Sequence, residues 1–269
     1  MTISLPPIGL GTWPMRGREG TAAVISAIEK GYRLIDSAFN YENEGVVGTA
    51  VRTCGVPREE LIITSKLPGR HHKQSHVVPT IEETVARMGL DHIDLYLIHW
   101  PNPSQELYVD AWKGMIEAKE AGIVKHIGVS NFLPDHIEKI EAETGVRPEV
   151  NQIELHPMFP QLDQLQWHEE KGIIVEGWSP LRRGNEATSA PAVTEVAAAH
   201  GITPAQAILA WHRAIGSLPL PKSSDPVRQS ENLAAMEIEL TDDEVASISA
   251  LGRPDGRQAD QNPEYYEEM

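Results

Sequence analysis

Residues 61–100, LIITSKLPGRHHKQSHVVPTIEETVARMGLDHIDLYLIHW, carry the pattern that decides the fold. The runs LIIT and IDLYLI are short and apolar, which is typical of buried strands. Between them Ile81, Val85 and Met88 recur at helical spacing. A strand, a helix and a second strand in this order predict two parallel strands joined by a crossover helix.

The same alternation extends over the rest of the chain. Trp112, Met115 and Ile116 also repeat at helical spacing. Eight strands that alternate with helices predict an α/β fold in which a parallel sheet closes into a (β/α)₈ TIM barrel, and a doubly wound open sheet is the alternative. The six apolar runs that complete the set of eight are PIGLG (7–11), RLI (33–35), HIGV (126–129), EVNQI (149–153), IIVEGW (173–178) and LPLP (218–221).

Two helix starts carry a capping box, in which a Thr and a Gln or Glu three residues later satisfy backbone amides reciprocally. These are Thr203 with Gln206 and Thr241 with Glu244. No repeat, linker or change of composition divides the chain. Residues 1–269 are therefore interpreted as a single domain.

Composition excludes several classes of function. The net charge of −16 opposes binding to nucleic acid or to anionic membranes, because those partners require concentrated positive charge. Cys54 is the only cysteine, which excludes an internal disulfide and a cysteine-based metal cage. With no apolar run of membrane-spanning length, we expect a cytoplasmic protein. The acidic tail, residues 258–269 (QADQNPEYYEEM), is interpreted as a solvated terminal segment.

A polar or aromatic residue follows nearly every expected strand. A barrel brings all eight strand ends to one face, where active sites of this fold lie, so we expect these side chains to be neighbours. Any one of them alone is more simply explained as a rim residue, but eight at the same end indicate a site. They are Trp13, Asp36, Lys66, His99, Asn131, Gln152, Trp178 and Lys222.

Seven motifs resemble those of the aldo-keto reductases, in family order and over almost the whole chain. The resemblance implies an NADPH-dependent reductase of aldehydes, ketones or keto acids. Finer details such as SKLPGR and HWPNPS are most similar to bacterial members acting on a diketo sugar acid, and imply reduction of 2,5-diketo-D-gluconate to 2-keto-L-gulonate. The seven motifs are DSAFNYENE (36–44), TSKL (64–67), LYLIHWP (95–101), GVSNF (128–132), NQIELHP (151–157), WSPL (178–181) and PKSSDPVRQSEN (221–232).

The chemistry of carbonyl reduction explains a catalytic cluster of Asp36, Tyr41, Lys66 and His99. Hydride addition leaves negative charge on oxygen, so the site needs a proton donor and hydrogen-bond donors. Tyr41 can give the proton, and the ammonium of Lys66 would lower its pKa from about 10. Asp36 can neutralise Lys66, and His99 can orient the carbonyl. A capping role for Asp36 and Tyr41, or a Schiff-base role for Lys66, is the weaker interpretation.

Two further functions stay open beside the favoured one. A general aldehyde or methylglyoxal reductase would use the same catalytic cluster. A nicotinamide-binding redox sensor with little turnover could also retain it, because binding proteins of this family can keep the catalytic positions. The absence of turnover with any carbonyl would favour the sensor.

The chain has no dinucleotide fingerprint of the Rossmann type, because GLGTWP has Pro14 where a third glycine would stand. The resemblance instead implies an extended NADPH across the barrel mouth. The residues it assigns are Trp178 stacked on the nicotinamide, Ser130, Asn131 and Gln152 at the carboxamide, and Ser179 and Leu181 along the pyrophosphate.

An anionic cofactor on an acidic protein needs a local basic patch. Lys222, Ser223 and Arg228 supply one, and the fork of an arginine suits phosphate oxygens. The resemblance assigns these three residues to the adenosine 2′-phosphate, and assigns Glu231 and Asn232 to the adenine.

The sequence carries its weakest signals for the pocket that binds the small-molecule carbonyl. Trp13 and Trp100 are expected to wall it. The loop GRHHKQSH (69–76) places His72 and His76 four residues apart, a spacing that suits metal binding on a helix, but no carboxylate or cysteine is near and no metal is expected. By analogy with related barrels we expect a monomer, and an abbreviated hairpin at the barrel bottom because PIGLG comes so early.

Overall fold

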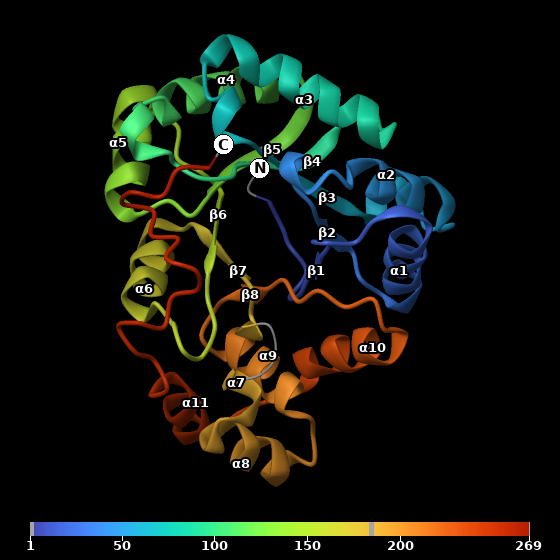
Figure 1. Ribbon diagram of the computed structural model, residues 1–269, viewed down its shortest axis with the longest axis vertical. Helices are drawn as coiled ribbons and strands as arrows, with labels where there is room; N and C mark the ends of the chain where they lie inside the picture. The colour runs from blue at the N-terminus through green and yellow to red at the C-terminus, as the bar shows by residue number, and fades with distance from the viewer. Residues whose placement is uncertain (1–2, 183–185, 269) are drawn as a thin grey trace.

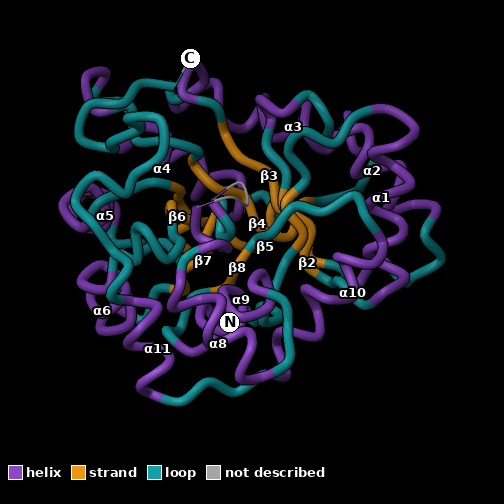
Figure 2. The backbone as a smooth tube through the Cα atoms, turned by 60° about the horizontal axis from the view of Figure 1, so that its bottom comes forward, coloured by secondary structure: helices purple, strands orange, loops and turns teal. Residues whose placement is uncertain are grey.

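The computed structural model describes residues 3–182 and 186–268, in which eight parallel strands pair in sequential order. Gly9 N donates to Pro219 O and Gly11 N donates to Pro221 O, both at 3.1 Å, so the first and last strands are also joined. The predicted barrel is confirmed, with its strands enclosed by helices (Figure 2). The strands are β1 Leu10–Gly11, β2 Leu34–Asp36, β3 Ile62–Leu67, β4 Ile93–Ile98, β5 Val124–Ser130, β6 Val150–Glu154, β7 Ile174–Trp178 and β8 Leu218–Pro219.

Helices follow the strands and cover the outside of the barrel (Figure 1). Within the described residues, no helix is long and apolar enough to cross a membrane. The α-helices are α1 Gly17–Lys30, α2 Glu44–Thr53, α3 Gln74–Met88, α4 Tyr108–Glu120, α5 Pro134–Thr144, α6 Leu162–Lys171, α7 Glu186–Ser189, α8 Pro191–His200, α9 Pro204–Ala214, α10 Pro226–Ala234 and α11 Asp242–Ser249. Short 3₁₀ helices are η1 Phe39–Tyr41, η2 Arg58–Glu60, η3 Gly69–His71, η4 Pro103–Gln105 and η6 Ala235–Glu237.

Both capping boxes form as the sequence predicts. The Thr203 hydroxyl accepts from Gln206 N at 3.2 Å, while the Gln206 side-chain oxygen accepts from Thr203 N at 3.1 Å, and α9 begins at the next residue. Thr241 and Glu244 make the same exchange before α11, at 3.3 and 2.8 Å. Reciprocal capping satisfies amides that the first helical turn leaves unpaired.

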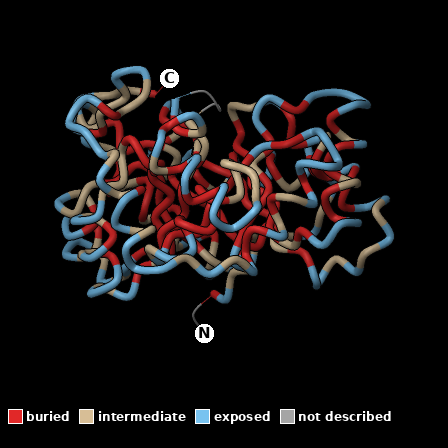
Figure 3. Tube along the Cα trace, turned by 90° about the horizontal axis from the view of Figure 1, so that it is seen from below, coloured by how far each residue is buried: buried red, intermediate tan, exposed pale blue. Residues whose placement is uncertain are grey.

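The core lies in and around the sheet (Figure 3). Every residue of β4 is buried, which explains why this strand is a continuous apolar run rather than an alternating one. The described residues before β1 contain no strand. Ile3 and Leu5 instead pack against Leu95 and Leu97, and Ile3 N donates to the Glu149 carboxylate at 3.1 Å.

The tail does not behave as a solvated segment, so that expectation is wrong for its last described residues. Asn102 accepts from Glu268 N at 3.0 Å and donates to Glu268 O at 2.5 Å, and the Tyr266 and Trp100 rings lie 4.4 Å apart between centroids. Backbone hydrogen bonds and ring contact thus hold an acidic segment against the barrel mouth. In Figure 1 the tail is the red trace running from α11 past α6.

Candidate active site

A buried ion pair lies at the ends of two neighbouring strands. Asp36 is the last residue of β2, and Lys66 lies next to the end of β3. Lys66 Nζ lies 2.6 Å from Asp36 Oδ1 and donates to Ser37 O at 2.8 Å. Burial alone would lower the pKa of Lys66, but Asp36 and Tyr41 raise it above its usual value. The lysine is therefore charged in the folded protein.

Tyr41 lies beside this pair, at the end of η1, with Lys66 Nζ 5.2 Å from its ring centroid. Burial raises the pKa of Tyr41 above its usual value of 10, Lys66 opposes this, and Asp36 and Glu268 raise the pKa further. Lys66 lowers the pKa of Tyr41, as expected, but desolvation of the phenolate outweighs the ammonium, so the net shift of this pKa is upward. The phenol consequently holds its proton at neutral pH.

His99 completes the cluster immediately after β4. Its ring centroid lies 5.8 Å from that of Tyr41, with the planes at 74°. Asn131 Nδ2 donates to His99 O at 3.0 Å, which ties the end of β4 to that of β5. The four side chains predicted to form the catalytic cluster are thus neighbours at one mouth of the barrel.

Four polar or aromatic residues form a hydrogen-bonded group at the ends of β5, β6 and β7, which Gln152 joins through its backbone oxygen. The Ser130 hydroxyl donates to Gln152 O at 2.8 Å, and Asn131 Nδ2 donates to the Ser130 hydroxyl at 3.0 Å. Trp178 Nε1 donates to Asn131 Oδ1 at 2.8 Å, which fixes the plane of a half-buried indole. These are the four residues that the sequence analysis assigned to the nicotinamide.

Glu176 is a buried residue that the sequence analysis missed. Gln152 Nε2 donates to Asp36 Oδ1 at 2.9 Å and to Glu176 Oε2 at 2.8 Å, and its amide oxygen has no hydrogen-bond partner among the described residues. Burial, and then the charge of Asp36, raise the pKa of Glu176 to about 7. A carboxylate inside the apolar run IIVEGW was the available signal, because an acidic residue is seldom buried without a role.

The loop after β7 places two of the assigned residues at the rim. Ser179 accepts a backbone hydrogen bond from Arg182 at 2.8 Å, and the half-buried Leu181 packs against both large core clusters. The loop continues into residues 183–185, which lie outside the described part of the chain. Contact of Ser179 and Leu181 with a pyrophosphate stays a prediction.

The basic patch surrounds the start of α10. Asp225 caps this helix by accepting from Val227 N at 2.8 Å, and the buried Ser223 hydroxyl accepts from Asp225 N at 3.2 Å. Lys222 and Arg228 are exposed, and Arg228 forms no ion pair with any residue the structure describes. An uncompensated arginine beside a helix N-terminus suits an anion.

The two residues assigned to adenine lie further along α10. Glu231 O accepts from Gln206 Nε2 at 3.1 Å, so α9 and α10 are joined there. Asn232 is buried and hydrogen-bonds Tyr32. Their side chains lie on the helix that carries Arg228, as the assignment requires, and their contact with adenine stays a prediction.

Comparison with known proteins agrees with this arrangement. The sequence model of the Aldo/keto reductase family matches residues 7–253. The chain belongs to the aldo/keto reductase family. Family membership makes it an oxidoreductase built on a TIM barrel, as the motifs implied.

Individual relatives of this aldo/keto reductase cover nearly its full length. The 2,5-diketo-D-gluconic acid reductase B of Corynebacterium sp. is 51% identical over 97% of this chain and 94% of its own. Methylglyoxal reductase DkgA of Salmonella typhimurium is 41% identical over 97% of this chain and 94% of its own. A solved structure of a Gox0644 mutant in complex with NADPH has a TM-score of 0.92 at 37% identity, covering 99% of this chain and 98% of that one.

The two tryptophans expected to wall the pocket of this aldo/keto reductase differ in environment. Trp13, after β1, is 51% exposed. Trp100, after His99, is buried, and its ring meets Trp178 edge-on at 6.5 Å and Tyr266 at 4.4 Å. Tyr266 is therefore a rim residue that the sequence analysis missed, because its place depends on the course of the tail.

In the histidine-rich loop of this aldo/keto reductase, the two histidines considered as metal ligands do not lie one turn apart on the same helix. His72 precedes α3, which begins at Gln74, whereas His76 lies within it. Burial lowers the pKa of His72 to about 4, and neither of its ring nitrogens is hydrogen-bonded to any residue that the structure describes. In residues 3–182 and 186–268, no three His, Cys, Asp or Glu side chains are grouped so that they could hold a metal ion.

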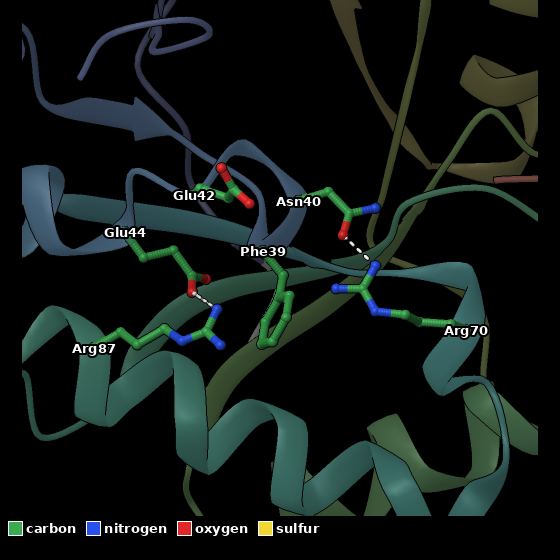
Figure 4. A pocket seen from close by; sticks show the side chains of 6 residues that line it. All are labelled: Phe39, Asn40, Glu42, Glu44, Arg70 and Arg87. Carbon is green, nitrogen blue, oxygen red and sulfur yellow. Dashed lines mark hydrogen bonds and ion pairs between the residues drawn. The ribbon is translucent and has the colours of Figure 1, made fainter. Parts of the chain in front are cut away.

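A cavity of about 440 Å³ lies on the outer side of η1, and none of the four catalytic candidates lines it (Figure 4). Arg70 donates to Asn40 Oδ1 at 2.5 Å, and Arg87 lies 3.5 Å from the Glu44 carboxylate. The guanidinium groups of both arginines also lie over the Phe39 ring, at 5.4 and 4.0 Å. These contacts support η1, and hence Tyr41, from outside the barrel.

Proposed function

We propose that this aldo/keto reductase reduces a small-molecule carbonyl with NADPH, with Tyr41 as the general acid. The observation that carries the proposal is the buried Lys66–Asp36 pair beside Tyr41, with His99 at the same mouth. NADPH, when bound, supplies the hydride that adds to the carbonyl carbon. The side chains of this protein must supply the proton and stabilise the negative charge that develops on the oxygen.

The proton comes from the Tyr41 hydroxyl and goes to the carbonyl oxygen. Because its pKa is raised, Tyr41 is protonated before the reaction begins. Lys66 stabilises the phenolate that is left behind, and Asp36 keeps Lys66 charged. His99 donates a hydrogen bond to the same oxygen, where negative charge develops.

The residues at the mouth fit a nicotinamide and a 2′-phosphate. The free amide oxygen of Gln152 can accept from a carboxamide N–H, and the fixed indole of Trp178 offers a flat face for stacking. Arg228 offers the phosphate a guanidinium that is unpaired among the described residues, and Lys222 and Ser223 lie near it in the sequence. Ser130 and Asn131 complete the carboxamide site, Ser179 and Leu181 the pyrophosphate path, and Glu231 and Asn232 the adenine site.

We assign 2,5-diketo-D-gluconate as the favoured substrate, reduced to 2-keto-L-gulonate in a pocket walled by Trp13 and Trp100. The 51% identity to 2,5-diketo-D-gluconic acid reductase B supports this assignment. General aldehyde or methylglyoxal reduction is the second candidate, supported by the 41% identity to methylglyoxal reductase DkgA. A redox sensor that binds nicotinamide with little turnover is the third.

A panel of carbonyls separates these candidates. The protein is mixed with NADPH and 2,5-diketo-D-gluconate, methylglyoxal or a simple aldehyde, and nicotinamide absorbance is followed, with Tyr41→Phe as the control for contaminating reductases. A kcat/KM highest for the diketo acid supports the first candidate, and one highest for methylglyoxal supports the second. No turnover with any carbonyl, while NADPH still binds, would overturn the enzymatic proposal in favour of the sensor.

We further propose that the protein is a cytoplasmic monomer. Size-exclusion chromatography tests its oligomeric state.

A further inference from the structure

A buried carboxylate and a buried amide meet on neighbouring strands. Glu176 of β7 pairs in register with Gln152 of β6, so the two side chains lie on the same face of the sheet. Glu176 is 0% exposed and Gln152 is 2% exposed. Glu176 Oε2 accepts from Gln152 Nε2 at 2.8 Å, whereas Glu176 Oε1 has no hydrogen-bond partner among the described residues. The proton transfer from Tyr41 gives this carboxylate no role.

Two carboxylate oxygens determine which end of the Gln152 amide faces them. Gln152 Nε2 also donates to Asp36 Oδ1 at 2.9 Å, and that oxygen accepts from Lys66 Nζ at 2.6 Å as well. A primary amide carries both of its hydrogens on nitrogen, so its oxygen could not bind to such acceptors. Both hydrogens of Nε2 are therefore used, one by Asp36 and one by Glu176.

The opposite end of the amide is the end that a ligand can meet. The Gln152 amide oxygen has no hydrogen-bond partner among the described residues, and it can accept but not donate. A carboxamide N–H of a nicotinamide supplies the donor that this oxygen needs. Asp36 engages only one hydrogen of Nε2, so loss of Glu176 would leave a buried N–H without an acceptor, which favours rotation of the amide.

We propose that Glu176 is a positioning residue for the nicotinamide of NADPH. By accepting from Nε2, it holds the Gln152 amide so that the amide oxygen is left for the carboxamide N–H. Glu176 acts here as a hydrogen-bond acceptor and not through its charge, because a protonated carboxyl keeps its carbonyl oxygen as an acceptor. The inference rests on the proposed function, in which Gln152 contacts the carboxamide.

An effect of the charge of Glu176 can be separated from this role. Asp36, Tyr41 and then Glu176 raise the pKa of Lys66. A purely electrostatic role would act on Lys66, and through it on proton transfer from Tyr41. Cofactor binding measured without a carbonyl involves no proton transfer, so it reports the positioning role alone.

Calorimetric titration with two cofactors tests the proposal. NADP⁺ carries a carboxamide, whereas its 3-acetylpyridine analogue has a methyl ketone in that place and no N–H to donate. Glu176→Met removes the acceptor, so the ratio of the affinity for NADP⁺ to that for the analogue should fall by about 2- to 12-fold, the range for one hydrogen bond. Glu195→Met, the same change at an exposed position of α8, should leave the ratio unchanged.

Two conservative variants separate the acceptor from the charge. Glu176→Gln removes the charge but keeps an acceptor oxygen, so it should retain the wild-type ratio. Glu176→Asp keeps the charge but draws the carboxylate back by one methylene, so it should lower the ratio. Gln152→Met should lower the ratio by itself, and adding Glu176→Met should lower it no further, because Glu176 acts through Gln152.

A ligand without the nicotinamide shows whether the rest of the cofactor site is intact. Adenosine 2′,5′-bisphosphate should bind every variant with wild-type affinity, because it does not reach Gln152. Weakening of this ligand to the same extent as NADP⁺ in Glu176→Met would indicate a structural role and overturn the proposal. If Glu176→Met does not fold, the comparison of Glu176→Gln with Glu176→Asp decides.

The outcomes distinguish this inference from the proposed function. A wild-type ratio in both Glu176→Met and Glu176→Asp would overturn the positioning role. A ratio lowered in Glu176→Gln and unchanged in Glu176→Asp would assign the effect to charge, and would overturn it as well. A ratio that is the same in Gln152→Met and the wild type would instead remove the contact of Gln152 with the carboxamide, and the role of Glu176 with it. Carbonyl turnover is measured separately, so its absence would leave the binding result in place.

Discussion

The Lys66 ammonium and the Asp36 carboxylate meet at 2.6 Å with 0% and 6% of their side chains exposed. Gln152 links Asp36 to a second buried carboxylate, Glu176. Charges in such a dry site are stable only in each other's presence, because desolvation costs several kcal/mol per ion when no partner compensates it. The pair therefore supports the barrel, and in the proposed function it also supports the chemistry of Tyr41.

Replacing Lys66 should destabilise the fold as well as the reaction. Lys66→Met leaves Asp36 buried without its partner, and we expect the free energy of unfolding to fall by about 3–5 kcal/mol in urea titrations. The double variant Lys66→Met, Asp36→Asn should recover part of this loss, since it removes the stranded charge. Any residual activity of Lys66→Met should have a pH profile shifted upward, because Tyr41 loses its cationic neighbour. A single variant as stable as the wild type would contradict the coupling.

Tyr41→Phe should separate cofactor binding from chemistry. The change removes one hydroxyl, so NADPH affinity in a fluorescence titration should stay nearly constant while kcat falls by at least about 10²-fold. Tyr265→Phe, which alters an exposed tyrosine of the tail, is the matched control. Unchanged turnover in Tyr41→Phe would remove Tyr41 from the role of general acid.

Arg228→Ala should weaken NADPH binding selectively. A charge-assisted hydrogen bond contributes about 1.5–3 kcal/mol, which corresponds to about 10- to 150-fold in affinity. NADH lacks the 2′-phosphate, so its binding should hardly change, and Arg213→Ala, at an exposed arginine of α9, should affect neither cofactor. Titration of tryptophan fluorescence with both cofactors measures this. Equal weakening of NADPH and NADH would mean that Arg228 supports the fold rather than the phosphate site.

Acid should destabilise the protein through two buried histidines. Burial lowers the pKa of His72 to about 4 and that of His212 to about 3. The unfolded chain takes up these protons near pH 6.5, whereas the folded chain does not, so stability falls as the pH drops below about 6.5. Each histidine should remove about 2 kcal/mol between pH 7 and pH 5. His72→Asn should flatten this dependence in urea titrations at the two pH values, and His76→Asn, at an exposed site, should not.

The barrel and most of the site were predictable because their signals are local. Apolar runs of strand length, helical repeats and the capping boxes of Thr203 and Thr241 each depend on a few neighbouring residues. Parallel strands then bring their carboxyl ends together by geometry alone. Asp36, Lys66 and His99 could therefore be grouped before any contact between them was known.

Only the tertiary structure decides the direction in which the pKa of Tyr41 shifts and the place where the tail meets the barrel mouth. The raised pKa of Tyr41 follows from competition between desolvation and the Lys66 ammonium, and no pattern of residues encodes which term is larger. The contact of Glu268 with His99 depends on where the tail runs, which Asn102 and the Trp100 ring determine in space. Composition correctly indicated an acidic tail, but whether its charge faces water or the ring of His99 depends on packing between segments far apart in the chain.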